Sequence, residues 1–273
     1  MGMKYGLIFN PKIKNAIEYA RQVYSLMEKE HIVVEQECAA LMGKVGVPLE
    51  NADVDVLITI GGDGTILRTL HKKNAKIFGI NAGVLGFLTE IKGSEIRAGI
   101  ERLLAGDFKI ERRMRLSSML EDIKLPDALN EIVVHTSQVS KMRAFEIFVD
   151  DVLAQKVRAD GVIVSTPTGS TSYAMSAGSP ILDPRVEAVV ILPLAPFKLS
   201  IRPYVVPASS SVSIRLPESE RDCVVVVDGQ EEKKMKAGTI ISITRSKQDA
   251  EFVRFNMDFY KKLEEKLVAA TII

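Results

Sequence analysis

A glycine-rich pentapeptide, Gly61-Gly62-Asp63-Gly64-Thr65, follows the apolar run from Val54 to Ile60 and precedes the helix-like run from Ile66 to Leu70. Glycines allow a turn with positive φ and let an anion approach the main chain, and the start of a helix offers free N–H groups at the positive end of its dipole. The segment therefore predicts a phosphate-binding turn between a buried strand and a helix.

Asp63 is the unexpected residue in this turn, because a carboxylate among exposed amides repels phosphate. Accepting a proton from a hydroxyl, or holding a metal ion, would give that carboxylate a task. Asp63 is therefore a candidate catalytic residue, and Gly62, Gly64 and Thr65 are candidate nucleotide-binding residues.

The first hundred residues alternate between strand and helix patterns. Strands are expected over Tyr5 to Phe9, His31 to Glu35, Val54 to Ile60 and Lys76 to Ile80, and helices over Ala16 to Glu30, Thr65 to Lys72 and Ser94 to Ala105. This alternation predicts an α/β domain with an open parallel sheet and crossover helices. Ligands of such sheets bind beyond the carboxyl ends of the strands, where Asn10-Pro11 and the glycine-rich turn both fall.

After Gly106 the pattern changes to short β runs separated by turn residues. We expect residues 1–105 to form the α/β domain that carries the glycine-rich turn, residues 106–256 to form a mostly β nucleotide-binding domain, and a cleft to lie between them. Residues 257–273 form a helical tail, in which Phe259, Leu263 and Leu267 have the spacing of one buried face. The tail is expected to pack back on another element.

Composition narrows the partners to small molecules. Lys and Arg number 36 against 35 Asp and Glu, and the formal charge of +1 does not call for nucleic acid or a membrane surface. No apolar stretch approaches the roughly 20 residues that span a bilayer, and the start lacks a signal-peptide pattern, so a cytoplasmic location is expected. Cys38 and Cys223 are far apart and the three histidines are scattered, which predicts no protein-built metal site.

A second segment with chemical content runs from Arg158 to Tyr173, where a buried strand ends in a hydroxyl-rich turn and a helix start. Hydroxyls of Thr168, Ser170, Thr171 and Ser172 lie beside the amides of that helix start, and the ring of Tyr173 adds a flat surface with a polar tip. This surface suits a nucleotide. The alternative is simple helix capping, which needs only one hydroxyl.

Together these segments resemble the NAD kinase family, whose members transfer a phosphoryl group to the 2′-hydroxyl of the adenosine ribose of NAD. The Gly-Gly-Asp-Gly-Thr motif is shared with diacylglycerol-type lipid kinases and 6-phosphofructokinases. The specific resemblance lies in its combination with Thr-Pro-Thr-Gly-Ser-Thr-x-Tyr, Asn130-Glu131, Asp228-Gly229-Gln230 and the glycine-rich segment from Asn81 to Leu88.

The resemblance implies a role for each matching position. Asp63 matches the proton acceptor, Gly64 lines the site near the ribose, and Arg68 matches a basic nucleotide contact. The other implied nucleotide-binding residues are Asn130, Glu131, Lys141, Arg158, Asp160, Thr171, Ser172, Tyr173, Ala174, Met175, Ser176 and Gln230. Ser172 stands where alanine is common, and Lys141 where relatives carry histidine or arginine.

Three of these assignments have a purely structural alternative. Arg68 can lie on a solvated helix face, Asn130-Glu131 can be a strand entry before Ile132-Val133-Val134, and Asp228-Gly229 can be a turn between the strands Cys223 to Val227 and Thr239 to Thr244.

The resemblance also implies partners: NAD, a phosphoryl donor that is ATP, another nucleoside triphosphate or polyphosphate, Mg²⁺ or another divalent cation on the donor phosphates, and assembly as a homodimer or homotetramer. Two other functions stay open. One is a lipid or sugar kinase that uses the same glycine-rich turn, and the other is a catalytically silent protein that binds NAD(H) as a sensor.

Overall fold

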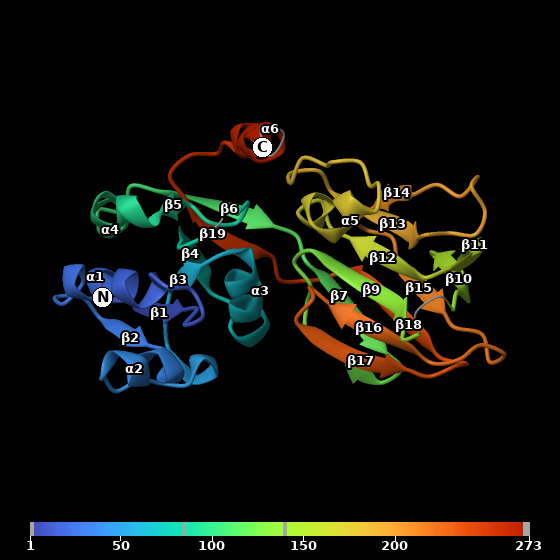
Figure 1. The fold of residues 1–273 in the computed structure, drawn as a ribbon, viewed down its shortest axis with the longest axis horizontal. Coiled ribbons are helices and arrows are strands. Elements are labelled where there is room, and N and C mark those ends of the chain that lie inside the picture. The colour runs from blue at the N-terminus through green and yellow to red at the C-terminus, as the bar shows by residue number, and fades with distance from the viewer. Residues whose placement is uncertain (1–2, 84–85, 139–140, 270–273) are drawn as a thin grey trace. The chain divides into compact units, whose positions relative to one another are not determined.

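The computed structural model describes residues 3–83, 86–138 and 141–269 (Figure 1). Contacts divide the chain into two compact units. The first unit contains residues 1–112 and 250–273, and the second contains residues 113–249. The predicted α/β part and the predicted mostly β part are both confirmed.

The first unit is built on a seven-stranded sheet of order β2-β1-β3-β4-β19-β6, with β5 paired to β4. The pairings of β1 with β2 and β3, and of β4 with β3, β5 and β19, are parallel. Its strands are β1 (Tyr5–Phe9), β2 (Ile32–Val34), β3 (Val56–Gly61), β4 (Lys76–Asn81), β5 (Ile91–Lys92), β6 (Lys109–Arg113) and β19 (Ala250–Arg254).

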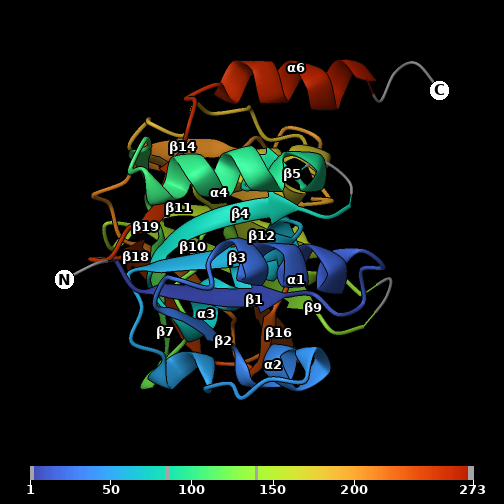
Figure 2. The same ribbon diagram turned by 90° about the vertical axis from the view of Figure 1, so that its left-hand side faces the viewer.

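Helices connect these strands, as the alternating pattern predicted. They are α1 (Ala16–Leu26), α2 (Gln36–Met42), α3 (Asp63–Lys72), α4 (Ile96–Leu104) and the C-terminal α6 (Phe259–Ala269), with short 3₁₀ turns η1 (Leu49–Asn51) and η2 (Gly93–Glu95). Helices α1 and α4 pack on each other, and α3 packs on β3 (Figure 2). The central strand β3 is buried along its whole length and leads through Gly62 into α3.

The second unit consists of two antiparallel six-stranded sheets, of order β11-β10-β15-β18-β7-β8 and β14-β13-β12-β9-β16-β17. The first sheet contains β7 (Leu116–Leu120), β8 (Ile123–Lys124), β10 (Arg143–Val149), β11 (Val152–Ala159), β15 (Val212–Arg215) and β18 (Ile240–Arg245). The second contains β9 (Glu131–Thr136), β12 (Gly161–Ser165), β13 (Ala188–Leu194), β14 (Tyr204–Pro207), β16 (Cys223–Val227) and β17 (Glu231–Met235).

One apolar cluster joins the inner faces of these two sheets, including Phe145 and Ile147 of β10 with Ile132 and Val134 of β9. The outer face of the second sheet has its own smaller cluster, which the short helix α5 (Tyr173–Ser176) covers through Ala174. The 3₁₀ turn η3 (Gly169–Thr171) leads into α5. Strands β9 and β12 are therefore buried on both faces.

The boundaries between the two units differ from those expected from the sequence pattern. Residues 106–256 were expected in the second domain, but β6 and β19 are strands of the first sheet. Strand β19 returns there because its alternate side chains Ala250 and Phe252 are fully buried, and Phe252 pairs with Ile77 of β4. Such a return depends on a partner strand about 175 residues earlier, which no local pattern reports.

The C-terminal helix confirms the predicted element but presents a different face. Phe259 and Leu263 are partly covered, whereas Leu267 is 39% exposed. Lys262 and Lys266 share the covered side instead.

Candidate active site

Asp63 is the first residue of α3 and follows the buried strand β3 across Gly62. Its two carboxylate oxygens accept separate backbone hydrogen bonds: Phe87 N–H donates to Oδ2 at 2.8 Å and Leu88 N–H donates to Oδ1 at 3.0 Å. A Cβ at Gly86 would lie 1.9 Å from Oδ1, so glycine is required for this approach. The carboxylate is thus held by the chain that follows β4.

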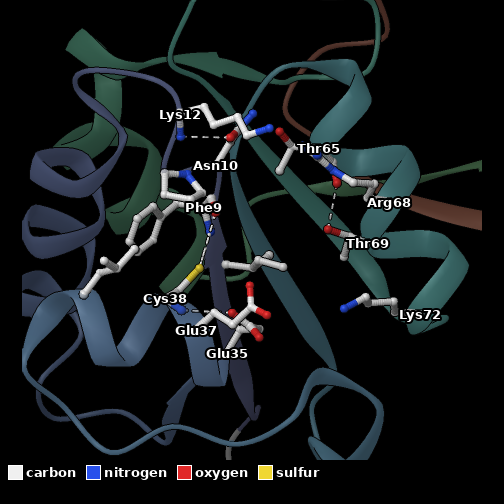
Figure 3. Close-up of a pocket in the computed structure, with 13 residues that line it drawn as sticks. Phe9, Asn10, Lys12, Glu35, Glu37, Cys38, Thr65, Arg68, Thr69 and Lys72 are labelled. Atoms are coloured by element: carbon white, nitrogen blue, oxygen red, sulfur yellow. Dashed lines mark hydrogen bonds between the residues drawn. The ribbon is translucent and has the colours of Figure 1, made fainter. Parts of the chain in front are cut away.

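The other side of α3 lines a cavity of about 250 Å³ at the carboxyl end of β1 (Figure 3). Asn10 and Pro11 meet Thr65 and Arg68 there, so the two segments that the sequence placed at this edge of the sheet are brought together. The Asn10 side chain is fixed by accepting the Lys12 N–H at 3.1 Å. Neither Asp63 nor Gly64 is among the residues that line this cavity.

Charge in the cavity is mixed. Lys12, Arg68 and Lys72 bring cations to its wall, and Glu35 and Glu37 of the α2 side bring carboxylates. Arg68 and Lys72 lie one turn apart on α3, and two cations at this spacing suit phosphate oxygens. Sequence reasoning placed Arg68 near the glycine-rich turn but missed Lys12 and Lys72, whose residue type alone gives no signal.

Cys38 also lines the cavity, and its thiol donates to the Phe9 carbonyl at 3.3 Å. Burial raises the pKa of the Cys38 thiol to about 12, so the thiolate needed for nucleophilic chemistry does not form at neutral pH. The cysteine is a packing residue, as the sequence predicted.

A separate polar cluster in the second unit contains Asn130, Glu131 and Ser172. The Ser172 hydroxyl accepts from the Asn130 amide at 3.3 Å and donates to Glu131 Oε1 at 3.3 Å. The serine that stands in place of a common alanine therefore links the amide to the carboxyl group. The structure brings these three predicted residues together and places Glu131 as the first residue of β9.

Asp228 holds the backbone of this cluster. Its Oδ1 accepts from the N–H groups of Asn130 at 2.7 Å and Glu131 at 3.1 Å, and its Oδ2 accepts from Leu129 N–H at 2.8 Å. Asp228 and Gly229 both have positive φ, and with Gln230 they form the three-residue loop of a hairpin, in which Gln230 N–H donates to the Val227 carbonyl at 2.9 Å. The turn connects β16 to β17. The sequence had indicated Thr239 to Thr244 as the next strand, because β17 is polar and lacks the apolar alternation of a strand.

Glu131 is only 5% exposed, and its Oε2 has no hydrogen-bond partner among the described residues. Burial, with a smaller contribution from the Asp228 carboxylate, raises the pKa of Glu131 from 4.5 to about 8. Glu131 is therefore mostly protonated at pH 7 and can donate a hydrogen bond. From the sequence alone, Glu131 would be taken for an ordinary ionised carboxylate.

Some hydroxyls of the hydroxyl-rich turn close the turn itself, and one joins the cluster of Asn130 and Glu131. Thr171 donates to the Thr168 carbonyl at 3.1 Å and Ser170 donates to the Pro167 carbonyl at 2.6 Å, which closes the turn locally. A Cβ at Gly169 would lie 2.1 Å from the Asn130 carbonyl oxygen, so this glycine lets the turn approach the start of β9. Of the hydroxyls from Thr168 to Ser172, Ser172 is the one bonded to Asn130 and Glu131.

The remaining predicted residues have varied positions. Ala174 is fully buried against the sheet, Met175 is partly buried, and Tyr173, Ser176 and Gln230 are exposed. Gln230 donates to the Asp228 carbonyl at 3.3 Å. Lys141 and Arg158 are exposed, and Asp160 is partly buried. Among the described residues, we find no side-chain hydrogen bond or ion pair from these three residues to Asn130, Glu131 or Ser172. Val84 and Leu85 of the expected glycine-rich segment lie outside the described residues.

Two further observations concern the described parts of the chain. Residues 3–83, 86–138 and 141–269 contain no group of three or more His, Cys, Asp or Glu placed to hold a metal. In the same residues, every helix is too short or too polar to cross a membrane.

Comparison with known proteins finds two family models. Residues 5–108 match the ATP-NAD kinase N-terminal domain, and residues 129–255 match the ATP-NAD kinase C-terminal domain. The NAD kinase of Thermococcus kodakarensis is 43% identical over 274 residues, covering 97% of this chain and 99% of the relative. The NAD kinase of Methanothermobacter thermautotrophicus is 40% identical over 278 residues, covering 99% and 98%.

Solved structures agree in fold. A yeast NADH kinase complexed with NADH superposes with a TM-score of 0.91 at 23% identity, covering all of this chain and 89% of the other. An NAD kinase from Archaeoglobus fulgidus in complex with ATP gives a TM-score of 0.78 at 28% identity, covering 98% of both. With matches over both units and nearly the full length, the chain belongs to the NAD kinase family of phosphotransferases.

Proposed function

We propose that this protein phosphorylates the 2′-hydroxyl of the adenosine ribose of NAD to give NADP, with Asp63 as the general base. The observation that carries this proposal is the Asp63 carboxylate at the start of α3, which two backbone amides hold in place. The other side of α3 lines a cavity that contains three cationic side chains. The relatives named NAD kinase support the choice of acceptor.

In the proposed step, the ribose oxygen forms a bond to the terminal phosphorus of the donor while the bond from that phosphorus to its bridging oxygen breaks. The hydroxyl proton passes to Asp63, and the shortened donor leaves with the electron pair. Phosphoryl transfer is largely dissociative, so orientation of the hydroxyl matters more than the basicity of the carboxylate. A carboxylate fixed by two hydrogen bonds suits this orienting role.

We propose that the backbone amides of Gly61 to Gly64 hold the terminal phosphoryl group of the donor beside Asp63. Lys12, Arg68 and Lys72, in the cavity on the other side of α3, attract the anionic donor. Mg²⁺ or another divalent cation, when bound, neutralises charge on those phosphates. Because the described residues hold no acidic cage, we propose that the cation enters with the donor and is held by phosphate and water oxygens. ATP is the proposed donor, in line with the ATP complex of the Archaeoglobus relative.

In the second unit, we propose that the cluster of Asn130, Glu131 and Ser172 binds the NAD molecule. Its amide and its protonated carboxyl group can read ribose hydroxyls or ring nitrogens. Asp228 would then act on binding indirectly, because it holds the backbone of Asn130 and Glu131. Contacts from Lys141, Arg158, Asp160, Tyr173 and Gln230, a homodimeric or homotetrameric assembly, and a cytoplasmic location stay predictions.

The test is the Asp63→Asn variant beside an Asp107→Asn control, which changes an exposed carboxylate on the same unit. Proton transfer by a positioned group typically contributes about 10²–10⁴-fold, so we expect Asp63→Asn to lose at least about a hundredfold in kcat. NAD binding by calorimetry should stay within a few-fold of wild type. Full activity of Asp63→Asn would remove the base from this scheme.

A panel of purified protein with ATP, another nucleoside triphosphate or polyphosphate, each against NAD, NADH and diacylglycerol, tests the reaction itself. Formation of NADP supports the proposal. Phosphorylation of the lipid would favour the lipid kinase reading, and binding of NAD without turnover under every donor would favour a sensor.

A further inference from the structure

The segment from Phe87 to Glu90 is held on both of its hydrogen-bonding sides. Its first two N–H groups, of Phe87 and Leu88, donate to the Asp63 carboxylate. Its carbonyl groups face the C-terminal part of the chain: Arg254 donates to the Leu88 oxygen at 2.8 Å, and Lys262 of α6 donates to the Thr89 oxygen at 2.8 Å. The two peptide groups that follow those bonded to Asp63 are therefore held by Arg254 and Lys262.

Buried charges reinforce this arrangement. Arg254 is 3% exposed and forms ion pairs with Glu90 at 3.2 Å and Glu111 at 2.8 Å. Lys262 lies 3.7 Å from the same Glu90 carboxylate, whose other oxygen accepts the Phe255 N–H at 2.7 Å. Breaking one partner of such a buried network leaves an uncompensated charge, so the network resists local rearrangement.

One turn further along α6, Lys266 places its ammonium 4.0 Å from the centre of the Phe87 ring. Phe87 also packs against Phe259 of the same helix, with ring centres 6.3 Å apart. Partial burial lowers the pKa of Lys266, and the Asp63 carboxylate opposes that shift. The Lys266 ammonium therefore lies over the ring of the residue whose amide donates to Asp63.

We propose that α6 is a positioning element for Asp63, in which Lys262 and Lys266 hold residues 87–90 in the conformation that presents the Phe87 and Leu88 amides to the carboxylate. The catalytic consequence rests on the proposed role of Asp63 as general base. Lys262 and Lys266 act through the main chain and are positioning residues. Their presence on the covered side of α6 explains why that side is not purely apolar.

The experiment compares Lys262→Met, Lys266→Met and Lys266→Arg with Lys261→Met, which changes an exposed lysine on the same helix. Methionine keeps much of the side-chain length and removes the charge, whereas arginine keeps both the charge and the stacking on Phe87. Hydrogen exchange of the Phe87 and Leu88 amides reports on the segment, and kcat and KM for NAD report on the reaction.

We expect each methionine variant at 262 and 266 to lower the protection of the two amides and the kcat by about fivefold, the factor that corresponds to about 1 kcal/mol of lost positioning. KM for NAD should stay within about twofold, because the NAD contacts are unchanged. Lys266→Arg should restore protection and kcat to near wild type, and Lys261→Met should change neither.

Three outcomes would overturn the proposal: unchanged amide protection in both methionine variants, reduced protection with unchanged kcat, or an equal loss in Lys261→Met. Failure of the proposed function gives a different result. If the wild-type protein forms no NADP, or if Asp63→Asn stays fully active, the base assignment falls while the exchange data still report whether α6 holds residues 87–90.

Discussion

Replacing Glu131 by Gln should make the stability of the protein less dependent on pH. Glu131 is 5% exposed, its Oε1 accepts from Ser172, and its Oε2 has no partner among the described residues. The neighbouring Asp228 carboxylate accepts three amides and carries its own negative charge. Ionising Glu131 in this environment is therefore costly, and glutamine imitates its protonated form in shape and neutrality.

The magnitude follows from the pKa of Glu131, which rises from 4.5 to about 8 on folding, mainly through burial. Because the folded state holds this proton more tightly than the unfolded state, the stabilisation is fully present below pH 4.5. It is lost as the pH rises, until the folded-state value of about 8 is passed. Between pH 5 and pH 9 the free energy of unfolding of the wild-type protein should fall by on the order of 4 kcal/mol relative to that of Glu131→Gln.

Urea unfolding of wild type and Glu131→Gln at pH 5, 7 and 9 measures this difference. Glu232→Gln, on the exposed edge strand β17, serves as the control and should follow wild type at every pH. A difference between Glu131→Gln and wild type that stays constant from pH 5 to pH 9 would refute the reasoning, because it would mean that Glu131 is ionised in the folded protein.

Two further substitutions test the close contacts of each unit. Gly86→Ala places a Cβ 1.9 Å from the Asp63 Oδ1, and we expect kcat to fall by about a hundredfold, as for loss of a positioned base, whereas Gly83→Ala, which meets nothing within 4 Å, should keep its activity. Equal activities of the two alanine variants in a kcat assay would contradict this. Asp228→Asn replaces one accepting oxygen by an NH₂ group, so that a donor then faces a backbone N–H. We expect the free energy of unfolding, measured by urea titration, to fall by about 2–4 kcal/mol. Asp122→Asn, at an exposed position, is its control, and a similar loss there would point away from the buried amides.

The local pattern was sufficient for the elements that present Asp63. A buried apolar run, a glycine-rich turn and an amphipathic run predict strand, turn and helix, and β3 and α3 form in that order. The resemblance carried by the same motifs was confirmed by matches over both units. Asn130, Glu131 and Ser172 were selected from two separate segments, and the pairing of β9 with β12 brings these segments together.

Other features of the site were beyond a reading of the sequence. The protonated state of Glu131 depends on burial at the start of β9 beside Ser172, and the structural task of Asp228 depends on amides nearly a hundred residues earlier. The edge strand β17 was missed because Glu231 to Met235 is polar, and exposed edge strands need no apolar face.

By itself, the sequence determined the order of strands and helices, the position of the glycine-rich turn and the kind of chemistry that Asp63 suits, because these depend on neighbours within a few residues. The tertiary structure alone decided what holds that carboxylate: amides 24 and 25 residues away, and behind them Arg254 and Lys262. The physical reason is that periodicity records which side of an element is buried, whereas hydrogen bonds and ion pairs between distant segments exist only once the sheet has brought those segments within a few ångströms.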